Sequence, residues 1–376
     1  MRSDIDFTRG ASEDQGYHAR VLMFFRFGIV SAKTKNDGDE REKSMVKLYN
    51  PKNGTTVILK NKIQILFEKN IEENAKKNGW CAPYVRGEAD GYASIPDPVS
   101  FSWETDDVNA ALILSKNEDM DPILFTKTGC DHCDVYNLEI GCTYYWRVGD
   151  SETRSFTVAD LTPRCLYVEG CANVRDIGGY RTVDGKRVKQ GMVYRGAQFD
   201  NLKELTVTEE GLRTLREVLG IRLDYDIRGL FEEDFNLTES FLGKDVRYFQ
   251  FPAESYGEFF QQPENCAIMI RQFTDPENYP LYIHCAGGAD RTGSLVAALE
   301  GILGMDDEDI FCDYEQTSIC SVGEGSSRHS RVFLHYLQQL DAYEGTFSQK
   351  VCHYMRAECG ITDAEMDKIR EILLEN

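Results

Sequence analysis

Between residues 87 and 163, the pattern of hydrophobic and polar positions predicts mainly short strands. Apolar and polar side chains alternate there in brief runs, and turn residues separate one run from the next. This spacing predicts a small β-sandwich, in which Trp103 and Trp146 would fill the core between the two sheets. The predicted strands are 99–103, 110–114, 143–148 and 155–158.

The pattern upstream of residue 87 predicts further segments. Arg26 interrupts the apolar run 21–30, which makes this run a poor signal-peptide core and favours a buried strand. No apolar stretch reaches the roughly 18 residues of a membrane-spanning helix, so we expect no membrane span. The other predicted segments are a solvated polar loop at 33–43, a strand at 55–67 and a short polar helix at 71–78.

Strands and helices alternate in the second half of the chain. Apolar and charged side chains alternate at 221–227 and indicate a half-buried strand, and 281–284 is another strand candidate. We expect the helices of this half to cover a sheet, so we predict an α/β fold with a mostly parallel central sheet. The predicted helices begin after the cap Thr208, at Ser294 and after the capping box of Thr362 and Glu365.

Length and composition indicate two folded domains. A chain of 376 residues exceeds the roughly 100–200 residues of a single core. We place a β-rich region at 1–162, best defined at 87–162, and the α/β domain at 163–376. The net charge of −21 disfavours nucleic acid and anionic membrane surfaces as partners, because both require a basic footprint.

The 12 cysteines are too sparse for a disulfide scaffold and indicate mostly free thiols. A reducing compartment suits them, so we expect a cytoplasmic protein, with export as the alternative. Cys130 and Cys133 flank Asp131 and His132 and resemble half of a zinc site, but no second ligand pair follows at usable spacing. We therefore interpret this cluster as a loop between strands, and we expect neither a metal nor a cofactor.

The segment 284–293 combines a nucleophile with a loop suited to phosphate. Cys285 ends a strand and can attack as a thiolate, which a helix N-terminus and an arginine stabilise. Arg291 offers a planar fork to two phosphoryl oxygens, and the hydroxyl of Thr292 can donate to the sulfur. Glycines let successive backbone N–H groups point inward. The expected phosphate-binding loop positions are Ala286, Gly287, Gly288 and Ala289.

The order of Cys285, five residues, Arg291 and Thr292 resembles the signature of the protein tyrosine phosphatase superfamily. A finer resemblance to the bacterial tyrosine/serine phosphatase family, which includes dual-specificity and phosphoinositide-cleaving enzymes, covers about 165–374. It implies a phosphomonoester hydrolase with a phosphocysteine intermediate and no cofactor. The motifs that carry it are 173–180, 193–195, 226–228 with Glu232, 313–314 and 354–360. The N-terminal region resembles a fibronectin type III domain at Trp103 and at 145–148.

The reaction also needs an acid for the leaving oxygen and a base for water. The resemblance implies that Asp290 serves as both, because it lies inside the loop. Glu254 is the alternative acid, since classical relatives place theirs on a separate loop after the preceding strand. Asp290 also has a structural interpretation, as an acceptor of backbone N–H bonds within the loop.

The substrate class stays open at this point. The resemblance implies a phosphorylated protein or small phosphomonoester, with phosphotyrosine first and dual specificity as an extension. An inositol polyphosphate or phosphoinositide phosphatase is the alternative, although relatives that cleave phosphoinositides often carry Lys where this chain has Ala289. Arg175 and Arg195 are the candidates for the pocket rim. A non-catalytic phosphate-binding module is the alternative from another class, and the role of the N-terminal region is open.

Overall fold

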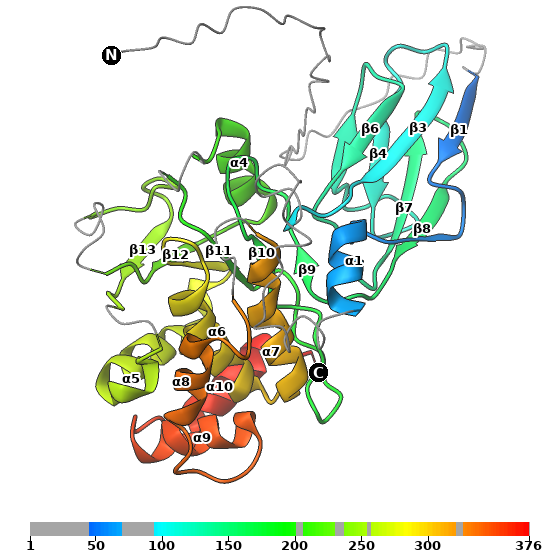
Figure 1. The fold of residues 1–376 in the computed structure, drawn as a ribbon. Coiled ribbons are helices and arrows are strands. Elements are labelled where there is room, and N and C mark those ends of the chain that lie inside the picture. The colour runs from blue at the N-terminus through cyan, green and yellow to red at the C-terminus, as the bar shows by residue number, and fades with distance from the viewer. Residues whose placement is uncertain are drawn as a thin grey trace, which may run out of the picture.

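The computed structural model describes residues 45–69, 94–200, 206–229, 237–253, 257–320 and 326–375 (Figure 1). The segments predicted at 21–30, 33–43 and 71–78 lie outside these residues, and so does Glu254. None of the helices in the described ranges has the length and apolar character that a membrane crossing requires.

Strand-rich, mainly antiparallel sheets form the described N-terminal region (Figure 1). The strands of one sheet, in spatial order, are β1 (Val46–Asn50), β3 (Val99–Thr105) and β6 (His132–Val135). The strands of the other are β2 (Thr55–Val57), β8 (Arg154–Val158), β7 (Thr143–Val148), β4 (Leu112–Ser115) and β5 (Phe125–Lys127). Only the β2–β8 pairing is parallel among the pairs of these two sheets.

Both sheets contribute to one hydrophobic core, as the alternating pattern predicted. The rings of Phe101 on β3 and Trp146 on β7 meet edge to face at 5.1 Å. Trp103 and Trp146 are buried, which confirms that both tryptophans fill this core. Such aromatic pairs contribute about 0.5–1.5 kcal/mol beyond their buried area.

Two predictions for this region were wrong. The apolar stretch 55–67 divides into the short strand β2 and the helix α1 (Lys62–Lys69), because a short apolar run fits either period. The side chain of Asn61 accepts a hydrogen bond from the Gln64 N–H at 2.9 Å and so caps α1. His132 and Cys133 belong to strand β6 and not to a loop, and Cys133 joins the core.

A mixed six-stranded sheet organises the C-terminal region and confirms the α/β, mostly parallel prediction for the described residues. Its strands, in spatial order, are β13 (Arg247–Gln250), β12 (Leu223–Asp226), β14 (Leu281–His284), β11 (Val193–Gly196), β10 (Arg175–Asp176) and β9 (Arg164–Cys165). The first four are parallel, and β10 and β9 are antiparallel to their neighbours. Every residue of β12 is buried, so the half-buried prediction was wrong: parallel strands have both faces covered.

Helix α6 (Asp290–Leu303) runs through the centre of the C-terminal region and is buried along most of its length, because neighbouring helices surround it (Figure 1). The caps predicted at Thr208 and Thr362 are confirmed, since each hydroxyl accepts a backbone N–H of its helix. The remaining α-helices of this region, among the described residues, are α4 (Glu209–Arg213) with a π-helical continuation (Thr214–Val218), α5 (Pro263–Arg271), α7 (Asp307–Gln316), α8 (Arg331–Gln338), α9 (Phe347–Ala357) and α10 (Asp363–Leu373). Short 3₁₀ helices lie at Phe259–Gln261, Gln272–Thr274, Pro276–Asn278 and Thr317–Ile319.

Polar contacts join the two regions near the predicted boundary. Arg164 Nη1 lies 2.6 Å from Asp176 Oδ2, and its Nε donates to the Leu138 carbonyl at 3.1 Å. Gln190 accepts from the N–H of Ile140 and donates to its carbonyl, each at 2.9 Å. The division into domains at 1–162 and 163–376 stays a prediction.

Candidate active site

The predicted phosphate loop connects the carboxyl end of β14 with the first turn of α6. Ligands of open α/β sheets bind at this edge of the sheet. Cys285 is 2% exposed at the end of β14. Asp290, Arg291 and Thr292 form the first turn of α6. The loop between them consists of Ala286, Gly287, Gly288 and Ala289, so the structure brings these sequence-predicted residues together.

The backbone of Gly288 explains why the loop can curl so tightly. Its φ of +64° lies in the left-handed region, which strongly favours glycine. A Cβ atom at this position would stand 2.1 Å from the carbonyl oxygen of Gly196, at the end of β11. The loop therefore packs directly on the neighbouring strand.

Hydrogen bonds from outside the loop hold its carbonyl groups. The Asn173 side-chain amide donates to the carbonyls of Gly287 at 3.1 Å and Gly288 at 3.2 Å. The Gln198 N–H donates to the Ala286 carbonyl at 2.9 Å. Carbonyls that are held on the outside of a turn leave the N–H groups to face its concave side, which is the arrangement of an anion-binding nest.

A buried ion cluster, which consists of Asp313, Arg175 and Arg195, supports the phosphate loop. Asp313 on α7 accepts from Arg175 Nε at 2.8 Å and from Arg195 Nη1 at 2.6 Å. Arg195 Nη2 also donates to the Gly288 carbonyl at 2.9 Å. Burial raises the pKa of Asp313, but the two guanidinium groups outweigh it and hold this pKa below its usual value.

The position of the two arginines corrects the expectation of a pocket rim. Arg175 is 2% exposed and Arg195 is 1% exposed, because both pair with Asp313 beneath the loop. Their side chains contact loop carbonyls and Asn173, as well as the Thr317 hydroxyl. They are placed to hold the loop and not to line an exposed rim.

Glu300 on α6 adds a buried acid beside this cluster. It is 1% exposed, and neither carboxylate oxygen has a hydrogen-bond partner among the described residues. Burial and the nearby Asp313 raise the pKa of Glu300 well above its usual value, although Arg195 and Arg175 oppose the shift. Burial and Asp313 therefore disfavour the ionised form of Glu300.

The histidine before the nucleophile is also fixed. His284 Nε2 lies 2.9 Å from Asp224 Oδ1. Burial lowers the pKa of His284, but the carboxylates of Asp226 and Asp224 outweigh it, and the net shift is upward. Asp226 in turn pairs with Arg228 at 2.7 Å. Although burial opposes ionisation, His284 and Arg228 lower the pKa of Asp226 to about 2.

Of the two candidate acids, Asp290 lies within the described residues and is fixed by a hydrogen bond. The Tyr314 hydroxyl donates to Asp290 Oδ1 at 2.5 Å, and this bond orients the carboxyl group at the start of α6. The Tyr314 ring packs on Gly293, where a Cβ atom would stand 2.7 Å away. Glu254 lies outside the described residues.

Thr292 is completely buried, and its hydroxyl has no hydrogen-bond partner within the described ranges.

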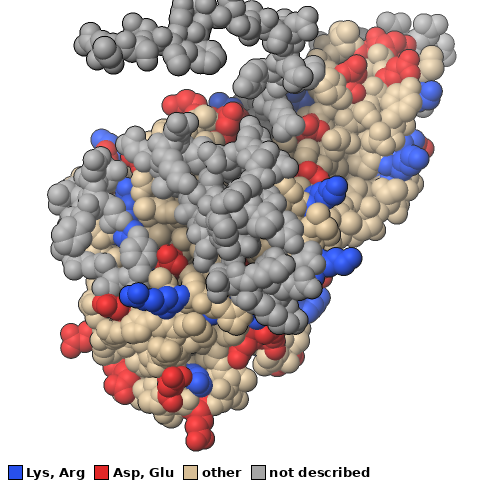
Figure 2. Space-filling model, in the orientation of Figure 1, with Lys and Arg blue, Asp and Glu red and all other residues tan. Residues whose placement is uncertain are grey.

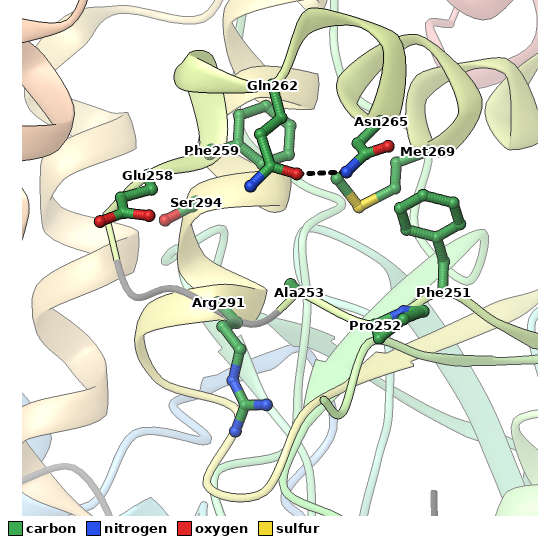
Figure 3. A pocket seen from close by; sticks show the side chains of 10 residues that line it. All are labelled: Phe251, Pro252, Ala253, Glu258, Phe259, Gln262, Asn265, Met269, Arg291 and Ser294. Atoms are coloured by element: carbon green, nitrogen blue, oxygen red, sulfur yellow. Dashed lines mark hydrogen bonds between the residues drawn. The ribbon is translucent and has the colours of Figure 1, made fainter. Parts of the chain in front are cut away.

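A pocket of about 350 Å³ lies beside Arg291, between α5 and the start of α6 (Figure 3). Arg291 is directed into the loop at one end of this pocket, while Gln262 and Asn265 hydrogen-bond to each other on the opposite wall. The lining residues are Phe251, Pro252, Ala253, Glu258, Phe259, Gln262, Asn265, Met269, Arg291 and Ser294. The described lining thus combines apolar groups with one acid and one base.

The molecular surface agrees with the acidic composition. Among the coloured residues in Figure 2, basic side chains are scattered between acidic ones and form no continuous patch on the face drawn. The described residues also contain no group of three or more His, Cys, Asp or Glu side chains placed to hold a metal ion.

Sequence reasoning gave no site role to Asn173, Asp313 or Tyr314. All three lie in the motifs that carried the family resemblance, and this position in the motifs could have identified them as residues of the site. Asn173 bonds to Gly287, Asp313 to Arg195 and Tyr314 to Asp290, and the two residues of each pair are more than 20 positions apart in the chain. Local patterns do not reveal such contacts.

Comparisons with known proteins give a family match and similar solved structures. The model of the tyrosine phosphatase family matches residues 166–375. The core catalytic domain of the PP-IP phosphatase SIW14 from S. cerevisiae, solved with citrate, is 16% identical at a TM-score of 0.27, over 40% of this chain and 86% of that one. A structure of the Siw14 catalytic core is also 16% identical, at a TM-score of 0.29, over 44% and 85%. No curated protein matches the chain.

Proposed function

The chain belongs to the tyrosine phosphatase family and is a hydrolase of that family, and from this premise we propose that it cleaves phosphomonoesters through a phosphocysteine at Cys285. The observation that carries the proposal is the loop itself. Cys285 lies at the end of β14, the loop carbonyls are bonded from outside, and Arg291 and Thr292 open α6. A non-catalytic phosphate-binding module has no need for the nucleophile or for Thr292.

The first step transfers the phosphoryl group to sulfur. The Cys285 thiolate supplies the electron pair for the new S–P bond while the P–O bond to the leaving group breaks. Inward N–H groups and the Arg291 fork stabilise the charge on the equatorial oxygens. Asp290 gives its proton to the leaving oxygen, so that an alcohol or phenol departs.

The second step releases phosphate. A water molecule attacks phosphorus, Asp290 takes its proton, and the S–P bond breaks with the electron pair returning to Cys285. The Thr292 hydroxyl, which has no partner among the described residues, can donate to the departing sulfur. We favour Asp290 over Glu254 because the bond from Tyr314 fixes its carboxyl group next to Arg291.

The substrate we propose is a phosphoprotein, with phosphotyrosine preferred and phosphoserine or phosphothreonine as a dual-specificity extension. The pocket beside Arg291 supports an aromatic group, because Phe251, Phe259 and Met269 line it. An inositol polyphosphate needs several cations, whereas Arg291 is the only basic residue among the described lining residues, and Glu258 is acidic. Inositol polyphosphates and phosphoinositides remain the alternative substrates.

A side-by-side assay tests the activity and the substrate class. We expect turnover of para-nitrophenyl phosphate and of phosphotyrosine peptides, with slower release of phosphate from inositol hexakisphosphate and phosphoinositides. Cys285→Ser abolishes turnover if the proposal is right, because an alkoxide is not available at neutral pH. Turnover that survives this substitution, or is absent from the natural chain, contradicts the proposal.

We further propose that the N-terminal sheets form a fibronectin type III-like domain within residues 1–162, separate from the phosphatase domain at 163–376. The common core that the two sheets share supports a sandwich. Limited proteolysis that cleaves first between Val158 and Arg164, and leaves two protected fragments, is the expected result.

A further inference from the structure

Helix α1 lies at the end of the N-terminal sheets in Figure 1. A hydrogen bond links it to the segment that supports the phosphate loop. Gln316, the last residue of α7, donates from Nε2 to Glu68 Oε1 on α1 at 3.1 Å. Gln316 is 2% exposed, and Glu68 also pairs with Lys60. The family match begins at residue 166, so α1 lies outside the part of the chain that the family covers.

The residue after Gln316 touches the groups that hold the loop. The Thr317 hydroxyl accepts from Arg175 Nη2 at 3.1 Å and from Asn173 Nδ2 at 3.4 Å. The same Asn173 amide donates to the carbonyls of Gly287 and Gly288. A continuous series of contacts therefore leads from α1 through the end of α7 to the phosphate loop.

Charged groups of α1 and of the ion cluster also affect the pKa of the Cys165 thiol on β9. Burial raises the pKa of this thiol to about 11, while Arg175 and Lys60 oppose the shift and Glu68 and Asp313 add to it. Groups of the N-terminal region and of the ion cluster under the loop thus act on one side chain. The contact between α1 and α7 is adjacent to the cluster and is not a remote surface contact.

We propose that α1 positions the phosphate loop, with the Glu68–Gln316 hydrogen bond as the link, so that the N-terminal region sets the oxyanion affinity of the active site. This inference rests on the proposed function, because it assumes that the loop binds phosphate. Glu68 and Gln316 are positioning residues. Neither is expected to touch the substrate.

A charge-swap experiment on the full chain tests the link. Gln316→Glu sets a second carboxylate against Glu68, and we expect it to weaken inhibition by inorganic phosphate about fivefold and to lower kcat with para-nitrophenyl phosphate. Adding Glu68→Gln restores a donor and an acceptor in reversed positions. The double variant should recover phosphate affinity to within about twofold of the natural chain.

Glu152→Gln is the matched control, because it removes an exposed acid that pairs with Arg154 on the N-terminal sheet and does not contact α7. We expect this control to leave the phosphate inhibition constant and kcat unchanged. All assays are run at least 15 °C below the lowest melting temperature in the set, so that each variant is folded.

The outcomes separate the inference from the proposed function. A Gln316→Glu chain that melts earlier but binds phosphate normally shows a purely structural contact and overturns the inference. Failure of the double variant to recover also overturns it. If the natural chain itself neither binds phosphate nor turns over substrate, the proposed function fails first.

Discussion

At the scale of single residues, the Asp290 carboxyl group is held through one oxygen by the Tyr314 hydroxyl at 2.5 Å. This geometry separates orientation from proton transfer, because Tyr314 can be changed while the acid is kept. A second acid, the buried Asp313 beneath the loop, pairs with two guanidinium groups. Each acid gives a testable expectation.

Asp290→Asn removes the proposed proton donor. We expect kcat/KM, which reports the first step alone, to fall about 100-fold or more for alkyl phosphates and phosphoserine peptides and to fall much less for para-nitrophenyl phosphate, since nitrophenolate leaves without protonation. Tyr314→Phe should cause a smaller loss with the same substrate order. Equal losses on both substrates would indicate a structural role, and the same comparison with Glu254→Gln tests the competing acid.

Asp313→Asn leaves two buried arginines without a counter-charge. We expect a loss of about 3–5 kcal/mol in the free energy of unfolding, measured with urea. Asp160→Asn is the control, because Asp160 pairs with Arg187 at the surface and should cost about 1 kcal/mol or less. Similar losses in both variants would contradict a supporting role for the buried cluster.

At the scale of elements, the turn between β14 and α6 depends on contact with β11. Gly288→Ala introduces a Cβ atom 2.1 Å from the Gly196 carbonyl in addition to the backbone strain at positive φ. Gly185→Ala carries strain alone, because its φ is +88° and no heavy atom lies within 4 Å of the added Cβ. We expect calorimetry to show tungstate binding lost only in Gly288→Ala, and equal affinities would argue against tight packing of the loop.

Asp226 at the end of β12, which pairs with the end of β14, makes the free energy of unfolding depend on pH. The pKa of Asp226 is about 2 in the folded chain against a usual value of 3.8, so its contribution is present above pH 4 and is lost as pH falls towards 2. The difference corresponds to about 2 kcal/mol. Urea unfolding of Asp226→Asn should therefore depend less on pH between 5 and 2, and an unchanged slope would contradict this assignment.

Sequence patterns predicted the elements whose signals are local. The strand 143–148 was predicted with the bounds of β7, and the Thr362 capping box lies within four residues of the chain. The burial of Arg175 was missed because its partner Asp313 lies 138 positions later. The covered faces of β12 and the helix α1 were missed for the same reason: packing partners decide them, and no local period records those partners.

At the scale of the whole molecule, the net charge of −21 acts on any anionic substrate. Long-range repulsion slows encounter, and added salt screens it over about 10 Å at 0.1 M. We expect kcat/KM for acidic phosphopeptides to rise about two- to fivefold between 10 and 200 mM salt. A neutral-flanked phosphopeptide should change little, and the opposite order would indicate a basic recognition surface elsewhere.

The pairing of two arginines with one carboxylate has a further consequence for charge balance. Arg175 and Arg195 share the carboxylate of Asp313, so these three ion-paired groups carry an excess of one positive charge, and burial disfavours a second negative charge on Glu300. A phosphate anion in the loop is attracted by this excess positive charge. Ligand and fold are therefore parts of one electrostatic unit, and inorganic phosphate should raise the melting temperature, with a shift that grows with the logarithm of its concentration above the dissociation constant.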